Sequence, residues 1–358
     1  MKVIDLFCGT GGFGLGARQA GFDVVGSIDI DPVLTSSHAM NFNSGALKLA
    51  DITELSGTSL LDWSGGKVDG IIGGPPCQGF SSMGRRDQSD PRRDLVGHFF
   101  RIVAEAKPSF FVMENVVGLL QGDAKEVLEA GLSEVPSDYN ILGPIILDAS
   151  DFGVPTSRKR CFVVGYHRER CDLPVIRRNK GASKANVRDA ICDLVSIKEI
   201  GVDARGFDVG ESLNCPSISP YAAKLKSENG RSTGHRRTKH TKAVVARFES
   251  VGQGKTDPIG RHQRLSWDGL CPTLRAGTGS DRGSFQSVRP IHPDEPRVIT
   301  VREAARLQGF PDTHLFHPTV WHSFRMIGNS VSPIVSAAVM DAVAQSCGVK
   351  SIPDVAAE

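Results

Sequence analysis

The sequence predicts an α/β fold with a doubly wound, parallel sheet and a smaller, loop-rich second domain. Short apolar runs alternate with helical patterns through the first half of the 358-residue chain, as parallel sheets require. A glycine-rich turn directly follows the first apolar run. After about residue 170 the alternation fades and Gly, Ser, Asn and Arg become frequent, although Val, Leu, Phe and Trp still recur. A second folded domain, rather than a linker, is therefore expected there.

The individual elements follow from the same patterns. Apolar runs bounded by turn residues predict buried strands at 2–7, 23–29, 68–74, 108–116 and 160–166. Helical patterns between them lie at 14–21, 33–42 and 95–106. Near the C-terminus, Thr300 and Glu303 form a capping-box pattern that begins a helix over 300–310, and a last helix follows Pro333.

The basic residues are unevenly distributed. The net charge is +2, but residues 151–300 contain 27 Lys and Arg against 16 Asp and Glu, so this segment carries +11 and the remainder −9. A solvated basic face is one explanation. A whole segment of one sign favours a polyanionic partner.

The cysteines and the N-terminus indicate the compartment. The eight cysteines are scattered without a CxxC pair, which predicts reduced thiols and no zinc or other metal site. "MKVIDLFCGTGG" lacks the features of a signal peptide, and no run approaches the roughly 18 uninterrupted apolar residues of a membrane span. We therefore expect a cytoplasmic protein with no membrane partner.

The glycine-rich turn "DLFCGTGGFGLG" (5–16) predicts a cofactor site. Its glycines let the backbone approach a ligand closely, although plain turn geometry explains some such matches. The second strand ends at Asp29, 20 residues after Gly9, where a nucleotide-binding fold places the acid that binds a ribose diol. An adenosine-containing cofactor is therefore expected.

The charge of this turn indicates which cofactor. Asp5 lies at its expected mouth, and residues 3–17 contain no Lys or Arg to assist a pyrophosphate. A sulfonium such as S-adenosylmethionine carries no phosphate and suits an acidic edge. Asp51, in "LADIT", is spaced to meet the adenine, or else caps a helix.

The stretch "GGPPCQGFS" (73–81) sets Cys77 behind two prolines and between glycines. Prolines stiffen the backbone, and the glycine at 79 leaves room for a planar group beside the thiol. A cysteine that only fills a core needs no such setting, so a presented nucleophile is favoured over an inert buried thiol.

Five motifs in order resemble those of the DNA (cytosine-5) methyltransferases. They are "DLFCGTGGFGLG", "GGPPCQGFS", "ENV", "RVITVREAARLQGFPD" and "RMIGNSVSP". The resemblance covers 1–166 and 289–345 and fades over 167–288, where such enzymes differ in target sequence. It implies a Rossmann-like S-adenosylmethionine-dependent methyltransferase domain at 1–192 plus 322–358, because the family folds its last helix back. A DNA target-recognition domain is then expected at 193–321.

The chemistry assigns roles to three residues. Cytosine C5 is a weak nucleophile. Addition of the Cys77 thiolate to C6 converts the ring into an enamine, and C5 of this enamine can attack a methyl group. Glu114, in "ENV", is expected to assist at N3, which requires burial to raise its pKa; a structural carboxylate is the alternative. By resemblance, Arg160 in "TSRKR" holds the cytosine O2, although the family usually has Gln where this chain has Thr156; a surface arginine is the alternative.

The remaining pocket residues come from the resemblance, whereas the DNA contacts rest mainly on the basic residues of 80–93 and of the +11 segment. The target base must flip out of the duplex to be reached. Those expected to line the cofactor pocket are Phe7, Gly9, Gly11, Gly12, Asp29, Ile30, Asp51, Ile52, Pro76, Leu95, Asn329 and Ser330. Those expected to contact double-stranded DNA are Ser81, Arg85, Arg86, Arg158, Arg236, Arg237, Arg275 and Arg282. Ordinary core packing remains open for Phe7, Ile52 and Leu95, and solvated charge for each arginine.

The resemblance favours a nucleoid-associated bacterial enzyme, paired in function with a restriction endonuclease. A monomer is the default expectation, because the sequence gives no sign of an oligomer. Three alternatives remain. A nicotinamide dehydrogenase shares the glycine turn but leaves Cys77 and Glu114 unexplained. A tRNA methyltransferase of the same family usually has a smaller recognition region, and a catalytically silent DNA-binding regulator has no need of either residue.

Overall fold

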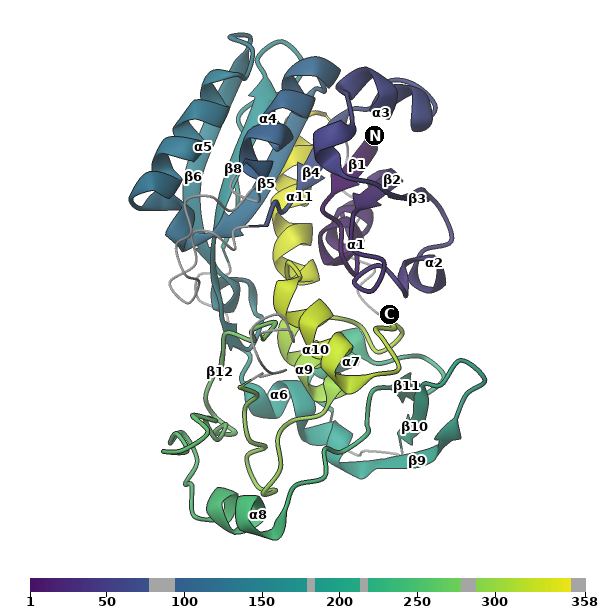
Figure 1. The fold of residues 1–358 in the computed structure, drawn as a ribbon, viewed down its shortest axis with the longest axis vertical. Coiled ribbons are helices and arrows are strands. Elements are labelled where there is room, and N and C mark those ends of the chain that lie inside the picture. Colours follow the sequence, from purple (N-terminus) through teal and green to yellow (C-terminus); the bar gives the residue numbers. More distant parts are fainter. Residues whose placement is uncertain (77–93, 179–183, 213–217, 278–287, 349–358) are drawn as a thin grey trace. The chain divides into compact units, whose positions relative to one another are not determined.

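The protein consists of two compact units. The computed structural model describes residues 1–76, 94–178, 184–212, 218–277 and 288–348 (Figure 1). The first unit comprises 1–148, 159–178 and 335–358, and the second comprises 149–158 and 179–334. The predicted boundaries were 192 and 322. The first boundary precedes α6 (Val187–Ile191), because α6 packs against α7 (Pro220–Leu225) and α9 (Val301–Gln308) of the second unit. The second follows α10 (Val320–Asn329), because α10 also packs against α9.

A seven-stranded sheet forms the first unit, in the order β3-β2-β1-β4-β5-β8-β6. The first five strands of that order pair in parallel, and β8 pairs antiparallel with both β5 and β6. The chain order reverses on either side of β1, which is the topological switch point where α/β sheets bind ligands. The strands are β1 (Lys2–Leu6), β2 (Asp23–Asp29), β3 (Ala46–Leu49), β4 (Gly70–Gly73), β5 (Phe110–Val116), β6 (Tyr139–Asp148) and β8 (Lys159–His167).

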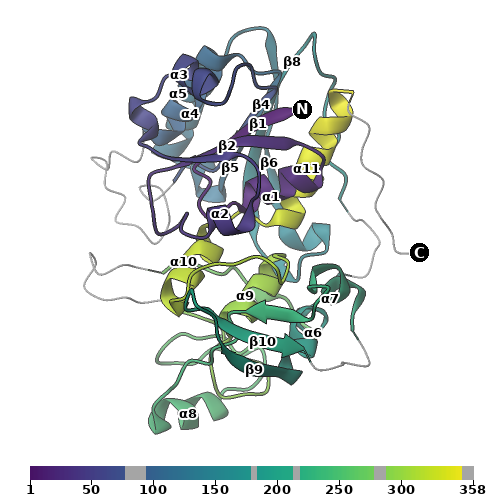
Figure 2. The same cartoon turned by 90° about the vertical axis from the view of Figure 1, so that its right-hand side faces the viewer.

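Helices cover both faces of this sheet, which confirms the doubly wound α/β class (Figure 2). One face carries α3 (Gly57–Trp63), α4 (Leu95–Ala106) and α5 (Asp123–Ser133), and α4 contacts both of the others. The other carries α1 (Gly12–Gln19) and α11 (Pro333–Ser346), which the Ser336 hydroxyl joins by donating to the carbonyl of Phe13 at 2.7 Å. The apolar side of α4 is fully buried against the strands, because Phe99 and Phe100 pack edge-on against Phe111 of β5.

All five predicted strands are present, but the sequence missed two more. β3 is only four residues long, and β6 contains Gly143 and Pro144, residues that weaken a strand prediction. The antiparallel direction of β8, which pairs with β5 and β6, was also not predicted. The helix predicted over 33–42 shortens to α2 (His38–Asn41).

The second unit surrounds α9 (Val301–Gln308), every residue of which is buried. Thr300 and Glu303 form the predicted capping box. The other elements of this unit are β7 (Thr156–Ser157), β9 (Ile197–Val202), β10 (Asp208–Ser212), β11 (Arg231–Thr233), β12 (Cys271–Pro272), α6, α7 (Pro220–Leu225), α8 (Lys242–Glu249) and α10 (Val320–Asn329). This unit also contains the short 3-10 helices η4 (Ala149–Phe152) and η5 (Cys192–Ser196), whereas η1 (Ile52–Glu54) and η3 (Val117–Leu120) belong to the first unit.

The expectation that the thiols are reduced is wrong for one pair. Cys171, just after β8, forms a disulfide with Cys347 at the end of α11. The two residues are 176 positions apart, so sequence spacing gave no sign of the bond. The backbone also joins these segments, because the Asp172 amide donates to the Ser346 carbonyl at 2.8 Å.

Among the residues that the structure describes, one helical stretch is long and apolar enough to cross a membrane. Val320–Ser346, which includes α10 and α11, reaches a mean hydropathy of 1.3 over 18 residues. However, 72% of that window is buried by the protein itself, as in a core helix.

Candidate active site

The glycine turn after β1 has an unusual backbone. Phe7, Gly9 and Gly11 have φ angles of 58°, 52° and 85°, so three of five successive residues adopt left-handed conformations. For Phe7 this conformation is strained, and such strain concentrates at functional sites. A Cβ at Gly11 would lie 2.4 Å from the Phe42 ring, whereas a Cβ at Gly9 would meet nothing within 4 Å. The turn therefore leaves open space above Gly9.

Asp29, at the end of β2, fixes this turn. Its two carboxylate oxygens accept the amides of Gly9 and Asp31, each at 2.8 Å. Burial raises the pKa of Asp29, although these hydrogen bonds oppose the shift. The next residue, Ile30, is 64% exposed, which leaves an apolar side chain free beside the carboxylate.

The sequence misplaced Asp5. Its side chain is 1% exposed, so it forms no acidic edge at the mouth of the turn. One carboxylate oxygen instead accepts the amide of Gly14 at 3.0 Å and pins the start of α1 to β1. Desolvation by burial raises the pKa of Asp5 to about 8.

Asp51 caps η1, the alternative that the sequence had left open. It accepts the Thr53 amide at 2.9 Å, and hydrogen bonds from Thr53 hold the pKa of Asp51 below its usual value. Its side chain remains accessible, so capping does not occupy the whole carboxylate. Ile52 is buried in the core cluster, and Phe7 and Leu95 are half-buried against the same cluster.

Glu114 and Arg160 meet across neighbouring strands. Glu114 of β5 pairs with Phe162, and Arg160 of β8 pairs with Val116, so both side chains project from the same face at a diagonal. The Arg160 Nε lies 3.1 Å from Glu114 Oε1, and the two side chains are 16% and 9% exposed. Because the ion pair is largely shielded from water, it holds both groups in fixed orientations.

The same strand also controls the loop that leads to Cys77. A Cβ at Gly74 would lie 3.4 Å from Glu114 Oε2, so the carboxylate borders the start of this loop. The side-chain amide of Asn115 donates to the carbonyl of Pro75 at 3.2 Å. Asn115 was not among the predicted site residues, although it lies inside the "ENV" motif. Pro76 follows directly, and Cys77, Ser81, Arg85 and Arg86 lie outside the described residues.

In the second unit, Arg158 does not face the surface as a DNA contact would. It is 3% exposed, and its guanidinium donates to the carbonyls of Leu274, Gly328 and Ser330. These bonds make Arg158 an anchor between segments of this unit, which sequence spacing did not reveal. Thr156, where the family usually has Gln, is likewise buried and donates to the Leu307 carbonyl.

The other predicted residues of this unit lie in varied positions. Arg236, Arg237 and Arg275 are exposed, and Arg237 forms an ion pair with Glu295 at 2.8 Å. At the end of α10, Asn329 is exposed, while Ser330 is buried and donates its hydroxyl to the Val331 carbonyl. Arg282 lies outside the described residues. Within the described residues, no group of three His, Cys, Asp or Glu side chains is arranged to hold a metal ion.

The profile of the family "C-5 cytosine-specific DNA methylase" matches residues 1–345, nearly the whole chain. The chain belongs to this family. This methylase is 42% identical to the type II methyltransferase M.XorII of Xanthomonas oryzae pv. oryzae, over 94% of the chain and 82% of that protein. It is 33% identical to M.DdeI of Desulfomicrobium norvegicum, over 96% of the chain and 88% of that protein.

Solved structures agree with the fold of this methylase. A putative DNA modification methyltransferase encoded within an E. coli prophage is 38% identical, with a TM-score of 0.84 over 97% of this chain and 99% of the other. The S. pombe Dnmt2 methyltransferase is 19% identical, with a TM-score of 0.64 over 97% and 99% of the two chains, and shows the shared fold alone.

Proposed function

We propose that this methylase transfers a methyl group from S-adenosylmethionine to C5 of a cytosine flipped out of duplex DNA. Family membership shows the cytosine-5 DNA methyltransferase activity itself. The observation that supports the mechanism is the arrangement at the end of β5. There Glu114 is ion-paired to Arg160 and borders Gly74, while Asn115 holds Pro75, two residues before the proposed nucleophile.

Cys77 would act as the nucleophile. A free thiol with a pKa of about 8.5 is only a few per cent ionised at pH 7, so the surroundings must favour the thiolate. The thiolate adds to C6, and the electron pair of the C5–C6 bond becomes available at C5. After C5 has taken the methyl group, a water or hydroxide removes the C5 proton. The C6–S bond then breaks, which restores the aromatic ring and the free thiol.

Glu114 would stabilise the negative charge that this addition places at N3. A protonated carboxyl is needed to donate a hydrogen there, and protonating an ordinary carboxyl at pH 7 costs about 3.7 kcal/mol. Glu114 is 7% exposed, and desolvation disfavours its charged form, whereas the Arg160 guanidinium at 3.1 Å favours it. Glu114 would therefore act as the donor once Arg160 has turned to the base. Arg160, held at 3.1 Å from the carboxylate, would bind the cytosine O2.

The residues at the switch point fit S-adenosylmethionine. Open space above Gly9 admits the ligand, the Asp29 carboxylate can accept hydrogen bonds from ribose hydroxyls, and exposed Ile30 offers an apolar surface to adenine. The loop has no Lys or Arg over residues 3–17, which suits a ligand without phosphate. Bound there, the sulfonium would supply an electrophilic methyl group. We assign the other pocket roles as predicted, to Phe7, Gly11, Gly12, Asp51, Ile52, Pro76, Leu95, Asn329 and Ser330.

The second unit would recognise the DNA. Its exposed arginines at 236, 237 and 275 suit phosphate or base contacts, and Ser81, Arg85, Arg86 and Arg282 remain predictions of the same kind. Arg158 is buried and is therefore not expected to contact DNA. The named relatives are type II methyltransferases, which supports a role in modification beside a restriction endonuclease. We expect a cytoplasmic, nucleoid-associated monomer.

Bisulfite sequencing of host DNA tests the proposal. The chain is expressed in a strain without cytosine methylation, beside the Cys77→Ala and Glu114→Gln variants. Protected cytosines in one short sequence context, absent from the Cys77→Ala culture, are expected. An unmethylated genome despite folded, abundant protein would refute the DNA reaction, and tRNA would then be assayed.

A further inference from the structure

A polar brace joins α4 to the turn that carries Asp51. Arg101 of α4 donates through Nη2 to the carbonyls of Ile52 and Leu55, at 3.1 and 2.8 Å. Its Nη1 also donates to Glu105 Oε1 at 2.9 Å, one helical turn further along. A single guanidinium therefore binds the backbone at the first residue of η1 and at the residue that follows it.

Glu105 extends the brace to the first residue of α3. Its Oε2 accepts the Gly57 amide at 2.5 Å. Gly57 also packs so closely that a Cβ there would lie 2.5 Å from the Glu105 Cβ and 2.7 Å from the Ala106 amide nitrogen. Burial raises the pKa of Glu105, but the bonds from Gly57 and Arg101 outweigh it, so the pKa lies below its ordinary value. The carboxylate is thus matched to the two donors that it holds.

The brace lies beside the carboxylate of Asp51. His98 accepts the Nε–H of Arg101 at 3.2 Å through Nδ1 and interacts electrostatically with Asp51. An exposed Arg–Glu pair four residues apart on a helix contributes little by itself. Here three of the hydrogen bonds reach the backbone of the neighbouring segment, so the pair fixes the position of that segment.

We propose that Arg101 and Glu105 are positioning residues for the adenine half of the cofactor pocket. They hold residues 51–57 in the binding conformation before the cofactor arrives, so binding does not have to order this turn. The inference rests on the proposed function, in which Asp51 and Ile52 meet the adenine. Neither brace residue takes part in the reaction at Cys77. Their loss should therefore weaken cofactor binding and leave the rate at saturation unchanged.

The test uses the full chain with Arg101→Met. We expect the Kd for S-adenosylhomocysteine, measured by calorimetry, and the KM for S-adenosylmethionine to rise about tenfold, with kcat within twofold. Arg101→Lys keeps the charge and some of the hydrogen-bond donors, so its Kd and KM should lie between those of the wild-type chain and of Arg101→Met. The matched control is Lys125→Met on α5, which removes another pair four residues apart, Lys125–Glu129, with both side chains 60% exposed. That control should change neither constant.

A second readout separates positioning from general stability. S-inosylhomocysteine lacks the 6-amino group, so an ordered Asp51 should discriminate against it, and Arg101→Met should reduce that discrimination severalfold. A variant that melts at a lower temperature but binds both ligands as wild type would overturn the inference. If Arg101→Met does not fold, the same test is made with Glu105→Gln. Its Kd for S-adenosylhomocysteine is compared with that of the wild-type chain, and its Kd for S-inosylhomocysteine with its Kd for S-adenosylhomocysteine. The Asp51→Asn variant tests the pocket assignment itself. If it binds S-adenosylhomocysteine as tightly as the wild-type chain does, the assignment of Asp51 to the adenine is overturned.

Discussion

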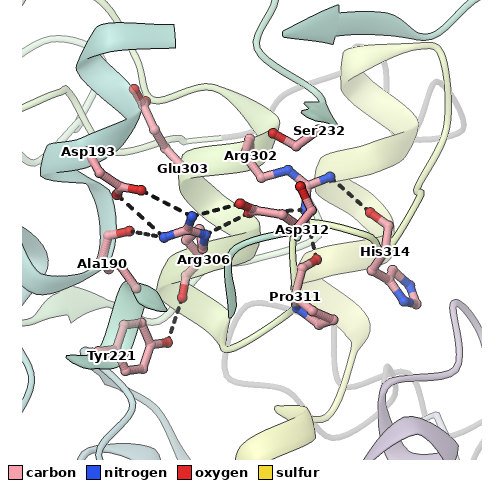
Figure 3. A network of polar contacts seen from close by, with 12 residues as sticks. Ala190, Asp193, Tyr221, Ser232, Arg302, Glu303, Arg306, Pro311, Asp312 and His314 are labelled. Carbon is pink, nitrogen blue, oxygen red and sulfur yellow. Dashed lines mark hydrogen bonds and ion pairs between the residues drawn. The ribbon is translucent and has the colours of Figure 1, made fainter. Parts of the chain in front are cut away.

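Replacing Arg306 with methionine should strongly destabilise the second unit. Arg306 lies on α9 with a fully buried side chain at the centre of a polar network (Figure 3). It binds Asp312 through two short bonds, Nε to Oδ1 at 2.6 Å and Nη2 to Oδ2 at 2.7 Å. It also reaches the two carboxylate oxygens of Asp193 at 3.4 and 3.2 Å and the Ala190 carbonyl at 3.2 Å. Every nitrogen of the guanidinium is thus used.

The magnitude follows from what would be left behind. Methionine fills part of the volume but donates no hydrogen bond, so two nearly fully buried carboxylates lose their main cation. Removing one partner of a buried ion pair typically costs about 3–5 kcal/mol. For a folding unit of this size each kcal/mol lowers the midpoint by about 2–4 °C, so a loss of about 10 °C is expected.

Differential scanning calorimetry, with hydrogen exchange of the α9 amides, measures the effect. The matched control is Arg205→Met, because Arg205 also binds an aspartate, Asp203, through Nε and Nη2 at 3.0 and 2.8 Å. The Arg205 side chain is 54% exposed, so its pair should contribute below about 1 kcal/mol. Equal midpoints for the two variants would refute the reasoning that burial makes the Arg306 network costly to break.

Three further predictions concern other parts of the molecule. Burial, and to a smaller extent the charge of Arg302, lowers the pKa of His235 from 6.5 to about 4. As the pH falls from 6.5 to 4, the imidazole is therefore protonated in the unfolded chain but not in the folded one. His235 alone should therefore lower the unfolding free energy by about 3 kcal/mol over that range, and a His235→Asn variant should lack this part of the pH dependence, as pH-dependent urea titrations would show. Asn115→Ala should lower kcat about tenfold, with cofactor affinity unchanged, because the loop before the nucleophile loses its anchor; an unaltered kcat in single-turnover assays would contradict this. Non-reducing peptide mapping should recover the Cys171–Cys347 bond, and replacing both cysteines with serine should cost about 2–5 kcal/mol of unfolding free energy.

Local sequence patterns predicted the features that local chemistry determines. The strands β1, β2 and β5 each contain a short apolar run, and such runs between turn residues indicate buried strands. The helix start at Thr300 required only a capping pattern of four residues. The spacing from Gly9 to Asp29 likewise placed the acid against the glycine turn, where the structure shows a hydrogen bond of 2.8 Å.

Other features depend on which segments the fold brings together. Asp5 and Asp29 lie near the ends of the neighbouring strands β1 and β2. Asp5 is buried because α1 covers it, whereas Asp29 is only half-buried. Arg158 resembled a surface cation until the structure placed three carbonyls from distant segments around it. Arg101 shows the same problem, because its spacing to Glu105 is that of an ordinary surface pair on a helix. Tertiary contacts, rather than residue type, assign these side chains to their roles.

The buried arginines also bear on the charge argument for DNA binding. An excess of +11 over residues 151–300 supports a phosphate partner only if those charges reach the surface. In the part of that segment which the structure describes, the buried charges are Arg158, Arg264 and Arg297 against Asp193 and Asp257. Removing three cations and two anions leaves an excess of +10, so burial consumes almost none of it. The buried arginines of the second unit are therefore additional to those that give its surface a positive charge. That surface charge still favours a polyanionic partner, although Arg158 does not contact it.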